Sequence, residues 1–120
     1  MSIQAVARKF VEMCNAGKNF EVMQTMYAPD IVSVEGDGKE TVGQEAVIKK
    51  SADWAGTLTF HGEKVLGPYF NGPNQFAVHF TLDITRTATG QRVQLTEVGV
   101  YTVNTAGLIT REVFYYDGDH

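Results

Sequence analysis

Cysteine and clustered positive charge are both scarce in this sequence. Cys14 is the only cysteine, which excludes an internal disulfide and a metal site built from several cysteines. It falls on an apolar helical face, where we expect a buried structural thiol. The ten Lys and Arg residues are scattered, and the formal net charge is -4. Because nucleic-acid binding requires clustered basic side chains to neutralise phosphates, we expect no nucleic-acid partner.

Long apolar runs are also missing. No stretch approaches the roughly 20 residues that a membrane-spanning helix needs, and the first residues lack the charged and apolar regions of a secretory signal. We therefore expect no membrane partner and a cytoplasmic location. No His or Cys pattern has the spacing of a metal site, so we expect Asp117, Asp119 and His120 to form a solvated tail. Neither a metal ion nor a cofactor is predicted.

Apolar residues make up 43% of the 120-residue chain and aromatic residues 11%, which is enough for a packed core. In the absence of a repeat or a linker, we expect a single domain over residues 1–120. Apolar side chains spaced three and four apart, Pro29 after the second segment and a capping-box pattern at 41–44 predict three helices. The expected helices cover residues 3–14, 19–27 and 44–54.

Strands are expected where apolar and polar residues alternate. A short run at 31–35 is β-prone, and from residue 57 onward the pattern has a period of two. Turns that contain glycine separate the later strands. The expected long strands cover residues 57–70, 75–86, 91–103 and 108–116. The first of these is expected as one strand or as two with a break near Gly62. Three helices followed by an antiparallel series of strands indicate an α+β fold.

Two segments, NAGKNFEVMQTMYAPDIVSVEG near the start and YTVNTAGLITREVFYYD near the end, resemble the SnoaL-like group of the nuclear transport factor 2-like superfamily. The similarity spans residues 3 to 117. It implies a cystatin-like, cone-shaped barrel in which a curved antiparallel sheet wraps around three N-terminal helices. It also implies a pocket for a small, largely apolar organic molecule. The superfamily includes isomerases, cyclases, epoxide hydrolases and non-catalytic domains, so the resemblance leaves open whether the chain is an enzyme.

The turns predict which residues face one another across the last three strands. A three-residue loop at 88–90 would place His79 opposite Gly99. The next turn would place Glu112 opposite Gly99 from the other side. Because neighbouring strands lie about 4.8 Å apart, His79 and Glu112 would flank a glycine gap at roughly 10 Å from one another. A change of one residue in either loop would reverse the faces, because side chains alternate with a period of two.

Candidate catalytic residues share this predicted, helix-covered face: they are His79, Asp83, Glu97 and Glu112. Carboxylates raise the pKa of a nearby His and of one another, which would place an acid and a base near neutral pH. Such a pair could move protons on a carbonyl, an enol or an epoxide, so we expect a cofactor-independent isomerase, cyclase or hydrolase. The alternative is a non-catalytic ligand-binding or dimerisation domain in which these side chains line a water-containing cavity.

A second group of residues is expected to contact the ligand: Phe10, Met13, Tyr27, Glu35, Trp54, Thr81, Gly99, Tyr101 and Phe114. Glu35 follows the first strand, where the resemblance to ketosteroid isomerases implies a general base. The same resemblance places Phe10 and Gly99 where those enzymes carry the two side chains that stabilise the enolate. Because neither residue can do so, we do not expect steroid isomerisation.

The predicted register gives the sheet apolar side chains on both faces. Phe80, Leu82 and Ile84 would share one face with Val98, and Tyr101 would lie on the other. Three helices can cover only one face of such a sheet. A second copy of the chain, bound to the outer face as a homodimer, is therefore the expected cover.

Overall fold

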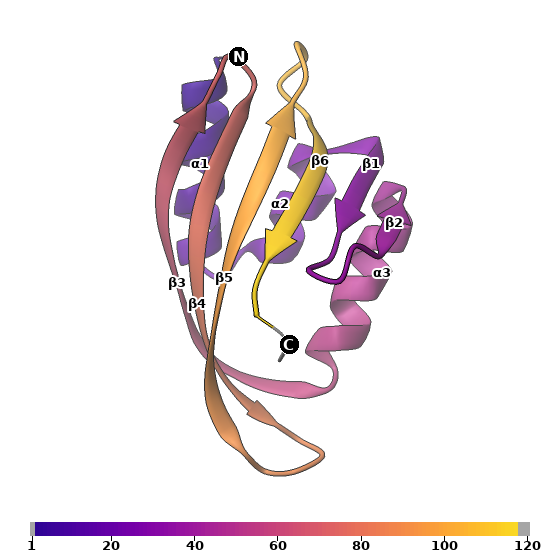
Figure 1. Cartoon of the computed structure of the whole chain (residues 1–120), viewed down its shortest axis with the longest axis vertical. Helices are drawn as coiled ribbons and strands as arrows, with labels where there is room; N and C mark the ends of the chain where they lie inside the picture. Colours follow the sequence, from indigo (N-terminus) through magenta and orange to yellow (C-terminus); the bar gives the residue numbers. More distant parts are fainter. Residues whose placement is uncertain (1, 118–120) are drawn as a thin grey trace.

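The computed structural model describes residues 2–117, in which three helices pack against one face of a six-stranded sheet (Figure 1). The helices are α1 (Ile3–Asn15), α2 (Asn19–Met26) and α3 (Gln44–Ala55). The strands are β1 (Tyr27–Val34), β2 (Glu40–Val42), β3 (Leu58–Asn71), β4 (Gln75–Arg86), β5 (Arg92–Val103) and β6 (Ile109–Tyr115). Asp119 and His120, which we expected in a solvated tail, lie outside the described residues. Within residues 2–117, no helix is both long and apolar enough to cross a membrane.

The first two helices follow the predicted pattern closely. Val6, Phe10 and Cys14 are buried along one face of α1 because they recur at helical spacing. The Ser2 hydroxyl accepts a hydrogen bond from a backbone N–H of the first turn, which caps the helix. Helix α2 ends before Pro29, and the backbone then becomes extended.

The start of α3 differs from the prediction. Gly43 occupies the position before the helix, with φ of 99°, and makes no side-chain cap. The capping box expected at 41–44 is therefore wrong. The Gln44 side chain instead donates to the carbonyl oxygens of Met23 and Gln24, at 2.9 and 3.1 Å. These bonds tie the start of α3 to the end of α2.

The sheet has the strand order β2-β1-β6-β5-β4-β3. The pair β1·β6 is parallel, and the other neighbouring pairs are antiparallel. The expectation of a wholly antiparallel sheet is therefore wrong at one pair. The long strands curve around the helices, and the sheet stays open because β2 and β3 form separate edges (Figure 1).

The pairing of β4 with β5 is displaced by one residue from the prediction. Arg86 donates its N–H to Gln91 across a loop of four residues, 87–90, whereas we predicted three. His79 therefore faces Val98 instead of the neighbouring glycine. Because side chains alternate along a strand, this one-residue change reverses the predicted face of every β4 side chain relative to β5.

The pairing of β5 with β6 is displaced by two residues. Gly99 faces Phe114, and Tyr101 faces Glu112. A shift of two returns each side chain to the face that was predicted for it. Glu112 therefore lies on the helix-covered face, as expected, but opposite a different residue.

The core lies between the helices and the concave face of the sheet. The β4 side chains on this face are all buried: they are Phe76, Val78, Phe80, Leu82 and Ile84. The ring of Phe10 from α1 lies 5.4 Å from that of Phe76. The prediction that Phe80 shares a face with Val98 is wrong, because the β4 residue opposite Val98 is His79.

Candidate functional site

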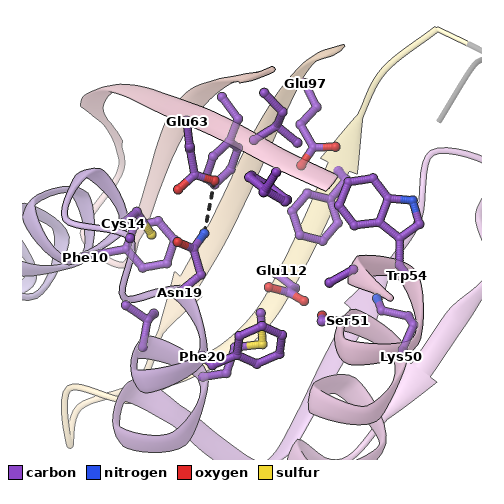
Figure 2. Close-up of a pocket in the computed structure, with 18 of the residues that line it drawn as sticks. Phe10, Cys14, Asn19, Phe20, Lys50, Ser51, Trp54, Glu63, Glu97 and Glu112 are labelled. Carbon is purple, nitrogen blue, oxygen red and sulfur yellow. Dashed lines mark hydrogen bonds between the residues drawn. The ribbon is translucent and has the colours of Figure 1, made fainter. Parts of the chain in front are cut away.

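A cavity of about 1040 Å³ lies between the helices and the concave face of the sheet. This volume is at the upper end of the range of roughly 300–1,000 Å³ that is typical of small-molecule pockets. Figure 2 shows Asn19 and Glu63 on one side of the cavity, and Lys50 and Trp54 on the other. The Phe, Tyr and Trp residues of its lining are Phe10, Phe20, Tyr27, Trp54, Phe60, Phe80, Tyr101, Phe114 and Tyr116.

The floor of the cavity is built from aromatic rings. Tyr101 stacks on Phe76 with ring centroids 5.2 Å apart and touches Phe10 at 4.5 Å. Gly99 makes this packing possible, because a Cβ at that position would lie 2.8 Å from the Tyr101 ring and 3.1 Å from the Phe80 ring. The glycine gap predicted from sequence is therefore filled by aromatic side chains.

A lysine and a carboxylate pair at the α3 side of the cavity. Lys50 Nζ lies 2.5 Å from Glu35 Oε1 and donates to the Ser33 hydroxyl at 2.8 Å. The Tyr116 hydroxyl donates to the other oxygen of Glu35 at 3.1 Å. The Lys50 and Glu35 side chains are 28% and 27% exposed, so this ion pair is partly removed from water. It gives the cavity one strongly polar wall.

Glu112 is the most deeply buried acid of the site, with 2% of its surface exposed. Its carboxyl accepts hydrogen bonds from the Tyr27 and Ser33 hydroxyls. Burial raises the pKa of Glu112, while those two hydrogen bonds and the charge of Lys50 act in the opposite direction. The same burial, together with the adjacent Glu112, raises the pKa of Tyr27.

Glu97 projects from β5 into the cavity, since it lies opposite Phe80 on the concave face. Burial raises the pKa of Glu97 to about 7, and the negative charges of Glu35 and Glu112 add to the rise. The charge of Lys50 lowers the same pKa. At neutral pH this carboxyl therefore populates both its acid and its base form, which is the condition for efficient proton transfer.

Glu63 is a second cavity carboxyl with this property. Burial raises the pKa of Glu63 to about 7, and a hydrogen bond from Asn19 opposes the rise. The Asn19 amide donates to Oε2 of Glu63 at 3.1 Å. Within the part of the chain that the structure describes, no group of three or more His, Cys, Asp or Glu residues is arranged to hold a metal ion.

The structure brings most of the predicted residues to the cavity. Glu97 and Glu112 line it, as do six of the residues expected to contact a ligand: Phe10, Tyr27, Glu35, Trp54, Tyr101 and Phe114. Gly99 is buried beneath the ring of Tyr101. Met13 packs against the core and is absent from the cavity lining.

Three predicted site residues, His79, Thr81 and Asp83, lie on the outer face of the sheet. The four-residue loop between β4 and β5 placed them there, since it reverses the predicted face of β4. Asp83 pairs with Arg92 at 2.8 Å, a contact on the solvent side that lowers the pKa of Asp83. The prediction that these residues gather with Glu97 and Glu112 is therefore wrong.

Several polar residues that line the cavity were not predicted, among them Asn19, Lys50, Glu63 and Tyr116. Ser33, whose hydroxyl accepts a hydrogen bond from Lys50, was not predicted either. A signal for Lys50 was present, because Val47, Lys50 and Trp54 recur at helical spacing on one face of α3. Glu63 is two residues before the buried Val65 in β3, so alternation places both on one face. The partners of these side chains come from distant segments and have no local signal.

Comparisons with known proteins agree with this architecture. The SnoaL-like domain family matches residues 1–116. A solved structure from Mesorhizobium loti, named as a SnoaL-like polyketide cyclase, is 43% identical with a TM-score of 0.89, over 97% of this chain and 100% of that one. Rv0760c from Mycobacterium tuberculosis, solved with estradiol-17β-hemisuccinate, is 22% identical with a TM-score of 0.73, over 98% of this chain and 95% of that one. A computationally designed 17-OHP binder is 21% identical with a TM-score of 0.71, over the same shares of the two chains. No curated protein matches the chain.

Proposed function

The chain belongs to the SnoaL-like domain family, and we propose that it binds a small, largely apolar organic molecule in the cavity and exchanges a proton with it through Glu97. The reaction class is that of a cofactor-independent isomerase, cyclase or hydrolase. The observation that carries this proposal is a carboxyl inside an aromatic cavity whose pKa lies at about 7. A general acid or base of this kind accelerates a reaction by about 10² to 10⁴.

The surroundings of Glu97 support its role as the group that exchanges the proton. Glu112 is held by Tyr27 and Ser33, so both its position and its proton are constrained. Lys50 supplies a positive charge that can stabilise an enolate or alkoxide formed next to Glu97. Glu112 and Lys50 therefore act as positioning and charge-tuning residues in this proposal.

The size and lining of the cavity support an apolar ligand. Apolar side chains provide most of the lining surface, with aromatic rings at the floor, while charged and amide side chains such as Lys50, Glu63 and Glu97 provide polar groups between them. This distribution is typical of sites that bind a hydrophobic body and orient it by a small number of hydrogen bonds. The Mycobacterium tuberculosis protein, which shares the fold, holds a steroid ester.

A non-catalytic ligand-binding domain is the second candidate function. The designed 17-OHP binder shows that this fold supports small-molecule binding by itself. In that case the protonated carboxyls would act only as hydrogen-bond donors to the bound molecule. Proton exchange on a bound carbon acid distinguishes the two functions.

The test uses 2-tetralone, a bicyclic ketone with acidic C–H groups beside its carbonyl. Deuterium incorporation in D₂O at pD 7 is followed by proton NMR, and binding is followed by Trp54 fluorescence. We expect Glu97→Gln to bind the ketone and to lower the exchange rate by about 100-fold or more. Asp83→Asn, on the outer face, is the matched control and should leave the rate unchanged.

Equal exchange rates in the wild-type chain and in Glu97→Gln would refute the catalytic assignment. Binding by the wild-type chain without any exchange above the buffer rate would favour the non-catalytic function. Failure of the wild-type chain to bind the ketone or estradiol-17β-hemisuccinate would refute both functions.

We further propose that two copies of the chain pair through the outer face of the sheet. Leu66 faces His79, His79 faces Val98, and Val98 faces Tyr115, so these four form a row across β3 to β6. Leu66 and Tyr115 are 44% and 59% exposed. The adjacent row contains Tyr69, Ala77, Val100, Val113 and Val34. An apolar band of this kind on a sheet face favours burial against another molecule.

Sedimentation velocity tests the pairing. We expect a dimer at micromolar concentration for the wild-type chain and a monomer for Val100→Arg, because a buried unpaired charge at the centre of an interface is strongly unfavourable. Glu45→Arg, on the exposed surface of α3, should remain a dimer. A wild-type monomer at 100 µM would refute the proposal.

We also propose a cytoplasmic location, since a reducing compartment suits the single buried Cys14 thiol.

A further inference from the structure

The hydroxyl of Tyr101 is a polar group of the cavity floor that the proposed chemistry does not use. Tyr101 lies on β5 two residues after Gly99 and four after Glu97, so alternation places all three on the concave face. Its side chain extends back along the strand over Gly99, because a Cβ at Gly99 would lie 2.9 Å from the hydroxyl oxygen. The hydroxyl therefore lies on the side of the ring that is nearer to Glu97.

The Tyr101 hydroxyl is open to the cavity although the residue is only 1% exposed. It has no hydrogen-bond partner among residues 2–117. Within that range, the unpaired side-chain atoms that are fully enclosed are Glu63 Oε1 and His79 Nδ1. The Tyr101 hydroxyl is not one of them, so the small surface that the residue retains includes this group. Because an unpaired hydroxyl in apolar surroundings is costly, we expect a bound molecule to complete it.

The second feature of this part of the cavity is an excess of negative charge around Glu97. Figure 2 shows the Glu97 carboxyl directed into the cavity. Besides burial, the charges of Glu35, Glu112 and Glu63 raise its pKa, and the charge of Lys50 lowers it. Lys50 is itself paired with Glu35 at 2.5 Å. The surroundings of Glu97 therefore favour a ligand that brings a positive charge.

Aromatic rings border the same place on the neighbouring strands. Phe80 on β4 faces Glu97, and Phe114 on β6 faces Gly99. Both rings line the cavity. The face of an aromatic ring carries negative electrostatic potential, so it attracts an organic cation, as the Phe114 ring does with Lys50 Nζ at 5.9 Å.

We propose that Tyr101 and Glu97 together bind a protonated nitrogen of the ligand, so that the molecule in the cavity is an apolar amine. The Tyr101 oxygen accepts one N–H and the Glu97 carboxylate accepts another. A hydroxyl is suited to this position, because it accepts from the nitrogen while donating its own proton to a carboxylate. This amine site rests on the proposed function of the cavity and deepens it by naming the charge of the ligand.

Other ligand classes satisfy fewer of these features. An alcohol could bond to the Tyr101 hydroxyl but would bring no positive charge to Glu97. A carboxylate would add a negative charge to a site that already holds several acids. A positive nitrogen also increases the acidity of the C–H groups next to it, which agrees with proton exchange through Glu97.

The experiment compares three probes that share a naphthalene body: 2-(aminomethyl)naphthalene, 2-(hydroxymethyl)naphthalene and 2-naphthoate. Isothermal titration calorimetry in two buffers of different ionisation enthalpy gives the affinity and the number of protons released. At pH 7.5 the amine should bind about tenfold more tightly than the alcohol, as expected for a charge-assisted hydrogen bond, and the naphthoate should bind most weakly.

The pH dependence identifies the ionised carboxyl. The amine stays protonated from pH 6 to 8, whereas Glu97 loses its proton across this range because its pKa is about 7. The affinity for the amine should therefore rise about tenfold from pH 6 to 8, with release of protons at pH 7. The affinity for the alcohol should not rise.

Two substitutions separate the contributions of the hydroxyl and the carboxylate. Tyr101→Phe keeps the ring over Gly99 and should bind the amine about fivefold more weakly, with the same pH dependence. Glu97→Gln cannot ionise, so it should bind the amine and the alcohol about equally at every pH. Tyr115→Phe, on the outer face of the sheet, is the matched control and should behave as the wild-type chain.

Equal affinities of the wild-type chain for the amine and the alcohol, or tightest binding of the naphthoate, would refute the amine site. An amine preference that persists unchanged in both Tyr101→Phe and Glu97→Gln would place the nitrogen elsewhere and would refute it as well. In these cases the small-molecule function still stands. If none of the three probes binds but 2-tetralone does, only the amine site fails; if 2-tetralone fails too, the proposed function fails with it.

Discussion

The stability of the fold should decrease as the pH rises from 5 to 8, and Glu97 should account for much of the decrease. The pKa of Glu97 is about 7 in the folded chain, against an ordinary value of 4.5. The folded chain therefore holds this proton more tightly than the unfolded chain does. Stability from the protonated carboxyl is fully present below pH 4.5 and is lost as the pH rises through 7.

The two pKa values set the magnitude of this loss. Between pH 5 and 8, a single carboxyl with these values lowers the free energy of unfolding by about 2.5 kcal/mol. Glu97→Gln cannot ionise, so it should remove about this amount from the pH dependence and be more stable than the wild-type chain at pH 8. Glu63 contributes a similar loss from its own raised pKa. Burial raises the pKa of Glu112 as well, so a smaller slope of the same sign should remain in Glu97→Gln.

The assay is urea unfolding followed by the fluorescence of Trp54, the only tryptophan, at half-unit steps from pH 5 to 8. Asp83→Asn is the matched control. The pKa of Asp83 is lowered by Arg92, so its stabilising effect is lost only as the pH falls below the range tested. A slope in Glu97→Gln equal to that of the wild-type chain would show that Glu97 is not buried as a neutral acid.

Two more predictions concern single contacts at the cavity. Lys50→Met should raise the pKa of Glu97 above about 7, because the charge of Lys50 lowers it; carbon-13 NMR of the carboxyl measures the change, and an unchanged or lower pKa would contradict it. Gly99→Ala should lower the free energy of unfolding by about 1–3 kcal/mol, since the new methyl would lie 2.8 Å from the ring of Tyr101. Gly62→Ala, where a Cβ would meet nothing within 4 Å, is its control, and equal effects of the two changes in thermal unfolding would refute the packing argument.

The helices and strands of this fold could be predicted from local sequence patterns, but the register between neighbouring strands could not. Helix α1 and strand β4 have long, regular apolar spacing, and the expected bounds agree with the structure to within one residue. The loop at 87–90 was different, because its sequence fits hairpins of three or four residues equally well. One hydrogen bond, from Arg86 to Gln91, decides between them.

The sequence predicted only those site residues whose position follows from the alternation of side chains along one strand. Glu97 and Glu112 reach the cavity because β5 and β6 kept their faces under a shift of two residues. Glu63 and Asn19 meet across 44 positions of sequence, so no local pattern indicates their contact. For Lys50, the face of α3 on which it lies could be predicted, but its contact with Glu35 could not.

The reversed face of β4 changes the chemistry that this cavity supports. In the predicted register the imidazole of His79 would have supplied the group that titrates near neutral pH. Proton transfer would then not have depended on the burial of a carboxyl. In the structure the β4 side chains that face the cavity, Phe80 and Leu82, are apolar, so they remove water from the carboxyls of the neighbouring strands. Loss of water moves the pKa of Glu97 to the range that a histidine has in water. The change of register that removes His79 from the cavity thus also creates the apolar surroundings in which the Glu97 carboxyl can titrate near neutral pH in its place. It follows that Phe80→Asn, which would admit water beside Glu97, should lower the pKa of Glu97 and slow proton exchange at pH 7 without any change to an ionisable residue.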